Sequence, residues 1–417
     1  MRELVDSYAP RGTRLLLTSS FLATVPLGYL IVVLPLYLAR AGIEPAIIGG
    51  FYTASGAMTA VLVAFSGVFA DRWGRRRFLI AGTLLPIASY LIFASTLDIP
   101  WLVFASFLGG VGLANGAAGA LTISSFDALL ADNTTETTRT KVFAASQALW
   151  SGALAIGSLC AGAPEVISRI AGIPAIDAYR PPYLVMAALT LFAGLALIPI
   201  RDDPAVHAKR ASAGWLPKRS RQAIATYSLG VGFLGFGLGI AIQLLPLWYG
   251  VRFGVHEGDL GPWYAAGQLA SLTTLVVIPY LERRLGGPNS MLVALSSAAI
   301  CLGLIVIAPV FWIAASLHVV RSFVTNLSWP FQQSMLMTAT VPEERATAVG
   351  TGFAVWGATN ALGPLAGGAL IGAGSFALPL LVGAVMYLCG GVVFGLGFRR
   401  LLARRAPVAT VYTDAAP

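Results

Sequence analysis

Residues 67–77 read GVFADRWGRRR and lie between two apolar runs, each long enough to cross a bilayer as a helix. The arginines of this stretch cannot enter hydrocarbon, because a charged side chain there is strongly unfavourable. Gly67 and Gly74 allow the backbone to turn sharply, since they carry no Cβ. Asp71 is the only acid among these arginines, so we expect it to have a fixed partner. The stretch therefore predicts a tight aqueous turn between two membrane-spanning helices.

The composition excludes a water-soluble protein. Of the 417 residues, 57% are hydrophobic and only 11% are charged, whereas soluble domains carry about 25% charged residues. The net charge of +9 does not indicate a nucleic-acid partner, because the basic residues lie in short turns and tails between the apolar runs. Cys160, Cys301 and Cys389 are isolated within apolar runs, so they predict neither a disulfide framework nor a metal site.

Apolar runs of about twenty residues recur along the whole chain, and each can span about 30 Å of hydrocarbon. We therefore expect an all-α polytopic membrane protein with twelve spans. The first run begins near Leu15 and lacks a small-residue cleavage site, so we interpret it as a retained span rather than a signal peptide. The expected spans are 15–38, 46–70, 78–97, 101–130, 142–164, 183–200, 223–250, 260–281, 290–308, 310–338, 346–372 and 376–398.

The distribution of Lys and Arg predicts the orientation in the membrane. The termini and the even-numbered loops carry 22 of the 27 basic residues, and the opposite loops carry four. Because basic loops stay in the cytoplasm, both termini should be cytoplasmic. The polar stretch 201–222 should be a cytoplasmic linker between an N-terminal six-helix bundle, residues 1–200, and a C-terminal one, residues 223–417.

The two halves show signs of an internal duplication. A shift of 206 residues aligns Arg139 with Arg345, and each of these arginines begins a segment that runs into the fifth span of its half. The same shift aligns further pairs, namely Trp150 with Trp356, Gly157 with Gly363 and Gly162 with Gly368. Residues 282–286, which read ERRLG, look like a second, altered copy of the arginine-rich turn.

The arginine-rich turn resembles the signature loop of the major facilitator superfamily, G-x-x-x-D-[RK]-x-G-[RK]-[RK], between the second and third helices. Every specified position matches, namely Gly67, Asp71, Arg72, Gly74, Arg75 and Arg76. The resemblance implies two pseudo-symmetric bundles that rock about a central substrate site. It implies a secondary active transporter in the plasma membrane, the bacterial inner membrane, that works by alternating access. We expect a monomer in the lipid bilayer with a small-molecule substrate, no enzymatic activity, no metal and no cofactor; proton coupling stays open.

The signature loop also implies a gating latch. In the family, an acid at the place of Asp127 resembles the partner of the loop's second arginine, here Arg75. The loop acid, Asp71, would meet the start of the eleventh helix near residues 346–350, where the helix dipole favours a carboxylate. Such a latch would hold the outward-open state and break when the cytoplasmic side opens. The alternative is a surface salt bridge worth less than about 1 kcal/mol.

Arg321 lies near the middle of the tenth span, too deep to reach the surface easily, and His318 lies one turn before it on the same face. No Asp or Glu lies near the midplane of a span to neutralise Arg321. The guanidinium should therefore face water or bind an anionic ligand in bidentate fashion; the alternative is a structural role on backbone carbonyls or Asn115. His318 could carry a coupling proton, although the neighbouring cation favours its neutral form.

Other polar and aromatic residues on the spans are candidates for the cavity wall, but such residues as often join helices. They are Tyr29, Asn115, Gln147, Gln243, Gln268, Asn326, Trp329, Gln333, Trp356 and Asn360. In the eleventh span, residues 363–368 read GPLAGG, which places Gly363, Pro364, Gly367 and Gly368 where a helix can flex or pack closely.

Two motifs depart from those of drug–proton antiporters in the superfamily. Their fourth helix carries R-x-x-x-G-x-G, whereas residues 106–112 here read SFLGGVG and lack the arginine. Their fifth helix carries G-P-x-x-G-G, whereas residues 157–162 here read GSLCAG. These departures weaken the antiporter interpretation. Because Arg321 is not neutralised and the spans lack acids near the midplane, we expect an organic anion or a polar neutral metabolite as substrate. The alternatives are a proton-coupled multidrug efflux antiporter, a transporter of lipid-like amphiphiles, and a non-transporting sensor or assembly factor on a transporter fold.

Overall fold

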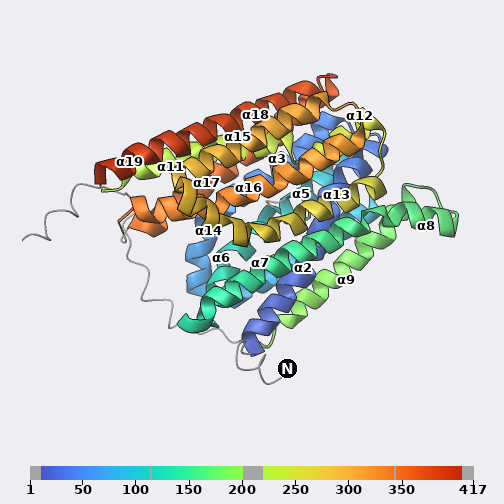
Figure 1. Ribbon diagram of the computed structural model, residues 1–417. Helices are drawn as coiled ribbons and strands as arrows, with labels where there is room; N and C mark the ends of the chain where they lie inside the picture. Colours follow the sequence, from blue (N-terminus) through green and yellow to red (C-terminus); the bar gives the residue numbers. More distant parts are fainter. Residues whose placement is uncertain (1–10, 113–114, 201–218, 342–343, 406–417) are drawn as a thin grey trace, which may run out of the picture.

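The computed structural model describes residues 11–112, 115–200, 219–341 and 344–405. These residues form helices and connecting turns, without strands in the described ranges. Most of the helices run side by side along one direction (Figure 1). Within these ranges, seven helices, or eight if one bent pair counts as a single span, are long and apolar enough to cross a membrane. The expected all-α membrane fold is confirmed, while residues 201–218 of the expected linker lie outside the described residues.

The described residues of the N-terminal part, 11–112 and 115–200, form eight α-helices and two short 3₁₀ turns. Several of these helices have a proline at their first or second position, where its missing N–H would have no helical partner anyway. The elements are α2 (Arg11–Arg40), α3 (Pro45–Trp73), α4 (Arg75–Ser95), α5 (Ile99–Leu108), α6 (Gly116–Asp132), α7 (Glu136–Leu159), η1 (Cys160–Gly162), α8 (Ala163–Ala171), η2 (Asp177–Tyr179) and α9 (Arg180–Ala196).

The C-terminal part, residues 219–405, repeats this pattern of long helices with local interruptions. One interruption is the π-helical turn η6 (Val393–Gly397), which lies near the end of the last expected span. The other elements are α11 (Arg221–Ala241), α12 (Leu245–Phe253), α13 (Glu257–Ala270), η4 (Ser271–Thr273), α14 (Thr274–Leu285), α15 (Gly287–Ile307), α16 (Phe311–Ala339), α17 (Arg345–Gly372), α18 (Ala377–Val392) and α19 (Phe398–Arg405).

The arginine-rich turn is shorter than expected. Helix α3 continues through Trp73 and α4 begins at Arg75, so that Gly74 alone joins them with φ 97° and ψ 124°. A residue with a Cβ rarely adopts this conformation, which explains why the joining residue is a glycine.

The expected fourth span, 101–130, is interrupted between α5 and α6. Gly110 and Gly112 have φ of 70° and 65°, and Asn115 has φ of 60°. The Asn115 carboxamide oxygen accepts the Gly110 N–H at 2.5 Å, which satisfies one of the amides that the interruption frees. The glycines therefore permit a local bend that the apolar pattern of the span does not reveal.

Equivalent contacts recur in the two parts of the chain. Gly157 of α7 packs against the backbone of α2 at Gly28, and Gly363 of α17 packs against α11 at Gly239. In both places a Cβ would lie within 2.5 Å of a backbone atom of the neighbouring helix. The Arg139 guanidinium donates to the Ala131 carbonyl, and Arg345, at the aligned position, donates to the Met337 carbonyl. Ala131 and Met337 are themselves 206 residues apart, which supports the expected duplication.

The ends of the helices define two ends of the molecule. We call them the Arg40 end, where α2 ends and α13 begins, and the Arg75 end, where α3 gives way to α4. In Figure 1 the Arg40 end lies on the right, near α8 and α12, and the opposite end lies on the left, near α14 and α19.

Candidate functional site

Three side chains fasten the two parts of the chain together at the Arg40 end. Arg40, the last residue of α2, places its Nη2 atom 2.7 Å from Oε2 of Glu257, the first residue of α13. The Tyr179 hydroxyl donates to Glu257 Oε1 at 2.6 Å, and it accepts from Arg40 Nη1 at 2.9 Å. Each member contacts the other two, so we call this group the Arg40–Tyr179–Glu257 triad.

The surroundings of the triad favour a neutral Tyr179. The Glu257 carboxylate is buried, but it lies in the first turn of α13, where the helix dipole stabilises a negative charge. Burial and the neighbouring Glu257 carboxylate raise the pKa of the Tyr179 phenol well above its ordinary value. Tyr179 therefore keeps its proton at neutral pH and donates a hydrogen bond to Glu257.

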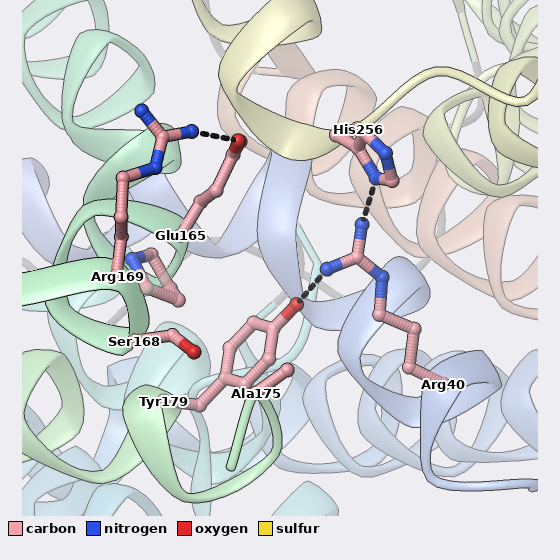
Figure 2. Close-up of a pocket in the computed structure, with 8 residues that line it drawn as sticks. Arg40, Glu165, Ser168, Arg169, Ala175, Tyr179 and His256 are labelled. Carbon is pink, nitrogen blue, oxygen red and sulfur yellow. Dashed lines mark hydrogen bonds and ion pairs between the residues drawn. The ribbon is translucent and has the colours of Figure 1, made fainter. Parts of the chain in front are cut away.

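His256 and a pocket lie beside the triad. His256 Nδ1 lies 2.6 Å from Arg40 Nη2 (Figure 2). The pocket has a volume of about 320 Å³. Arg169 and Glu165 form an ion pair of 3.0 Å on another side of it, and this pair lies within the single helix α8. The contacts of Arg40 join different parts of the chain, whereas the Arg169–Glu165 pair does not.

Helices α3 and α17 pack backbone against backbone at the same end. A Cβ on Gly368 would lie 2.2 Å from the Pro45 carbonyl oxygen, and one on Gly49 would lie 2.1 Å from the Pro364 carbonyl oxygen. The other two members of the GPLAGG motif, Gly363 and Gly367, approach α11 in the same way. This motif therefore holds α17 close to two helices, one from each part of the chain.

At the Arg75 end, the arginines of the signature turn contact other helices of the N-terminal part. Arg75 pairs with Asp132 at 3.1 Å, not with the expected Asp127. Arg76 donates to the Leu197 and Ile198 carbonyls just beyond α9, where the helix dipole favours a cation. The side chains of Asp71 and Arg72 lie outside the described part, so the expected contact of Asp71 with α17 stays a prediction.

Arg321 and His318 lie among aromatic side chains rather than beside an acid. Arg321 is 5% exposed, and its Nη2 atom donates to the Ser322 hydroxyl at 2.8 Å. The rings of His318 and Tyr264 are 4.5 Å apart. Tyr264 and Tyr387 lie close enough to Arg321 to interact with its charge. In the described part, Arg321 Nε, His318 Nδ1 and the Tyr264 hydroxyl have no hydrogen-bond partner.

The structure brings two of the expected wall residues together. Gln243 donates to the Asn360 carboxamide oxygen at 2.7 Å, and the Gln243 carboxamide oxygen contacts Gly112 in the interrupted fourth span. Asn326 instead bonds Ser271 at 2.6 Å, and Asn115 caps the interruption between α5 and α6. The remaining candidates are distributed over α2, α7, α13, α16 and α17: Tyr29 is buried, Gln147 is exposed, Gln268 is half-buried, Trp329 packs on Phe353, Gln333 bonds Tyr227 and Trp356 is half-buried.

The triad and His256 were not among the residues expected to be functional. Arg40 carried a signal, because a basic residue at the end of a span opposite the basic loops contradicts the usual charge distribution. Glu257 carried a second signal, because it is an acid at the start of an expected span. No feature of the sequence links Tyr179 to either of them.

Comparisons with known proteins agree with this architecture. The family model of the Major Facilitator Superfamily matches residues 16–326. Multidrug resistance protein 2 of Bacillus subtilis (strain 168) is 24% identical over 297 residues, which cover 69% of this chain and 70% of that protein. Multidrug resistance protein 1 of the same organism is 25% identical over 272 residues, 63% of this chain and 65% of that protein.

Solved structures match over almost the whole chain. A mutant of the nucleoside transporter NupG has a TM-score of 0.71 at 15% identity, and the match covers 93% of this chain and 99% of that one. The human organic anion transporter MFSD10 has a TM-score of 0.63 at 15% identity, with coverage of 92% and 99%. These matches show the fold, and the match to the family model shows the family. This chain belongs to the Major Facilitator Superfamily, and it is a membrane transporter and not an enzyme.

Proposed function

We propose that this transporter moves a small organic anion or a polar neutral solute across the membrane by alternating access. The support comes from the cluster of hydrogen-bond donors around Arg321. A buried donor without a partner disfavours folding by about 1–3 kcal/mol, so several of them in one place indicate a site that binds a ligand or water. Tyr264, Tyr387 and Arg321 can all donate, which suits a solute rich in acceptor oxygens.

The donor cluster reaches the N-terminal part through Tyr52 of α3. The Tyr52 hydroxyl is buried without a hydrogen-bond partner among the described residues, and it lies within electrostatic range of Tyr264. Its ring packs against Gly112, which also contacts Gln243. A solute bound between Tyr52 and Arg321 would contact both parts of the chain, as alternating access requires.

We further propose that the Arg40 end faces outward and the Arg75 end faces the cytoplasm of a bacterial inner membrane. The distribution of basic residues supports this orientation, because 22 of 27 belong to loops and tails expected at the Arg75 end. The triad then closes the outer side of the transporter. Its opening would let a solute enter or leave on that side, and the Arg75–Asp132 pair would brace the cytoplasmic side of the N-terminal part.

Multidrug efflux is the second candidate function. It is favoured by the similarity to two multidrug resistance proteins of Bacillus subtilis. Against it, the charged group that acts on Tyr264, His318 and Tyr387 is the Arg321 cation, which does not suit cationic drugs. The two candidates therefore predict opposite charge preferences for the same site.

A thermal-shift screen of the purified protein against anionic, neutral and cationic solutes tests the proposal. A ligand that binds the folded state raises its stability by about 2.7 kcal/mol at one hundred times its Kd. We expect an anionic or polar neutral solute to raise Tm, and proteoliposomes to transport the same solute. The Arg321→Gln variant should lose this shift, and Arg321→Lys should keep part of it, because lysine retains the charge but not the planar fork.

The matched control is Arg169→Gln, which removes one positive charge from an exposed pair in α8. It should leave both the thermal shift and transport unchanged. If Arg321→Gln has a normal Tm without solute and still transports the anion at the original rate, Arg321 does not bind the solute. A shift with cationic drugs alone would instead support multidrug efflux.

A further inference from the structure

We infer that His256 is a proton-binding site that controls the closure of the transporter at the Arg40 end. The inference concerns a site away from the donor cluster, and it does not depend on the identity of the solute. It rests on the contact between His256 and Arg40, on the triad that surrounds this contact, and on the pocket that borders both.

The contact fixes the protonation state of His256 in the closed form. A guanidinium has only donors, so His256 Nδ1 must accept a hydrogen bond from Arg40 Nη2, 2.6 Å away. A ring nitrogen can accept only when it carries no proton. The closed arrangement therefore requires a neutral His256.

Binding of a proton at His256 Nδ1 would remove this hydrogen bond and place two cations within hydrogen-bond distance. Arg40 lies on α2 and His256 directly precedes α13, so the repulsion acts between the two parts of the chain. The same Nη2 atom of Arg40 also pairs with Glu257. A movement of Arg40 away from His256 would therefore loosen the ion pair of the triad as well.

The other titratable and charged groups around His256 do not account for a change of charge beside Arg40 in the neutral pH range. Tyr179 stays protonated in the neutral range, because burial and the Glu257 carboxylate raise its pKa. The Asp259 carboxylate accepts the backbone N–H of His256 at 3.0 Å, and Arg169 neutralises Glu165 within α8. Histidine is the side chain that ordinarily changes charge between about pH 5 and 8. The groups that face His256 are Arg40 of α2, Tyr179 of η2, Glu257 and Asp259 of α13, and Glu165 and Arg169 of α8 across the pocket.

His256 is exposed and lines the pocket, so protons can reach it from the solution at this end. Acidification on that side would favour opening of the Arg40 end, and neutral pH would favour closure. With the proposed orientation, a proton from outside would open the outer side of the transporter. The closed arrangement could return only after this proton has left His256.

Distance measurements by double electron–electron resonance test the inference. Spin labels on cysteines introduced by Ile170→Cys in α8 and Val251→Cys in α12 report the separation of the two parts, because both positions are exposed. Cys160, Cys301 and Cys389 are first replaced by serine, and the protein is measured in lipid nanodiscs. Between about pH 8 and pH 5.5 we expect the ratio of long to short distances to rise roughly tenfold or more, since adjacent cations repel.

Two variants of His256 give the decisive comparison. His256→Gln can still accept from Arg40 but does not titrate, so its distances should stay short at both pH values. His256→Arg carries a permanent charge, so its distances should be long at both. If His256→Gln keeps the full pH response of the parent protein, the proton binds elsewhere and the inference is wrong.

The matched control is Glu165→Gln, which removes a carboxylate from the same pocket and leaves the contact of Arg40 with His256 and the triad in place. Its pH response should equal that of the parent protein. A pH response that disappears in this control as well as in His256→Gln would mean that the pocket as a whole titrates, and the assignment to His256 would fall.

Discussion

At the scale of single residues, the Tyr179 hydroxyl forms hydrogen bonds with two charged groups of opposite sign. It donates to a buried carboxylate and accepts from a guanidinium, and its ring lies 4.7 Å from that of Tyr37. The ring keeps the hydroxyl in place, so the hydroxyl can link the N-terminal part of the chain to Glu257.

We expect Tyr179→Phe to weaken closure at the Arg40 end by on the order of 2 kcal/mol, because hydrogen bonds to charged groups are the stronger ones. The phenyl ring should keep the contact with Tyr37. Spin labels at positions 170 and 251 would measure the result as a larger share of long distances at neutral pH.

Tyr183→Phe is the matched control for this change. The Tyr183 hydroxyl is also buried, but it has no hydrogen-bond partner among the described residues, and its ring lies 5.6 Å from that of Tyr37. Removal of this hydroxyl should leave the distances as they are. Equal effects of the two substitutions would show that the hydrogen bonds of Tyr179 do not hold the end closed.

The sequence predicts that Arg75 has an acidic partner, but it does not predict which acid this is. A charged partner near the end of the fourth span was expected, and the structure supplies one, but it is Asp132 and not Asp127. Five residues on a helix differ by about 140° in direction, so the two acids point to different sides of α6. The sequence gives the spacing of the acids, but the rotation of α6 about its own axis depends on packing.

We expect Asp132→Asn to lower the stability of the protein by about 1–3 kcal/mol, because the buried Arg75 guanidinium loses a carboxylate partner. Asp127→Asn removes the same charge five residues earlier and should change stability by less than about 0.5 kcal/mol. Thermal unfolding of both variants in detergent measures the difference. A larger loss for Asp127→Asn would restore the partner expected from the family pattern.

At the scale of the elements, the contact between α3 and α17 decides how closely the two parts of the chain approach. Gly368→Ala would place a Cβ 2.2 Å from the Pro45 carbonyl oxygen, which only a movement of a helix can relieve. We expect this variant to open the Arg40 end and to lower Tm. Gly350→Ala on the same helix meets no atom within 4 Å, so it should raise helix stability by up to about 1 kcal/mol.

The comparison of these two alanine variants isolates the close approach from the general effect of a glycine in a helix. Distances between labels at positions 170 and 251 and thermal unfolding are the measurements. If Gly368→Ala is as stable and as closed as Gly350→Ala, the backbone contact between α3 and α17 does not limit closure.

Most of the elements follow from the sequence, because long apolar runs leave few alternatives to helices in a bilayer. The interruptions do not follow in the same way. Between α5 and α6, residues 109–116 read GGVGLANG. This stretch is apolar enough to continue a membrane-spanning helix, but its glycines also allow the helix to be interrupted. Hydropathy measures only the apolar character. Whether the helix is interrupted depends on contacts such as that of Gly112 with Gln243.

At the scale of the whole molecule, an internal duplication would explain why similar contacts occur in both parts of the chain. The glycine contacts of α7 with α2 and of α17 with α11 hold equivalent helix pairs together. The glycine contacts between the two parts recur as well: Gly368 of α17 approaches Pro45 of α3, and Gly162 of η1, at the aligned position, approaches Gly258 of α13. The Arg40–Tyr179–Glu257 triad has no such repeat, because its members occupy unrelated positions. Repeated backbone contacts thus join the two parts, and the triad adds a contact that occurs only once.

The orientation of this arrangement in the membrane gives the last prediction. If the 22 basic residues of the termini and even-numbered loops face the cytoplasm, the Arg75 end is inside and the triad and His256 are outside. In the cysteine-free background, a membrane-impermeant maleimide added to intact cells should label Ile170→Cys, whose position on α8 is 81% exposed. It should label Arg77→Cys, at the exposed start of α4, only after the cells are opened. Labelling of Arg77→Cys in intact cells would show the opposite orientation. The contact between Arg40 and His256 would then close the inner side of the transporter, and His256 would respond to the pH of the cytoplasm.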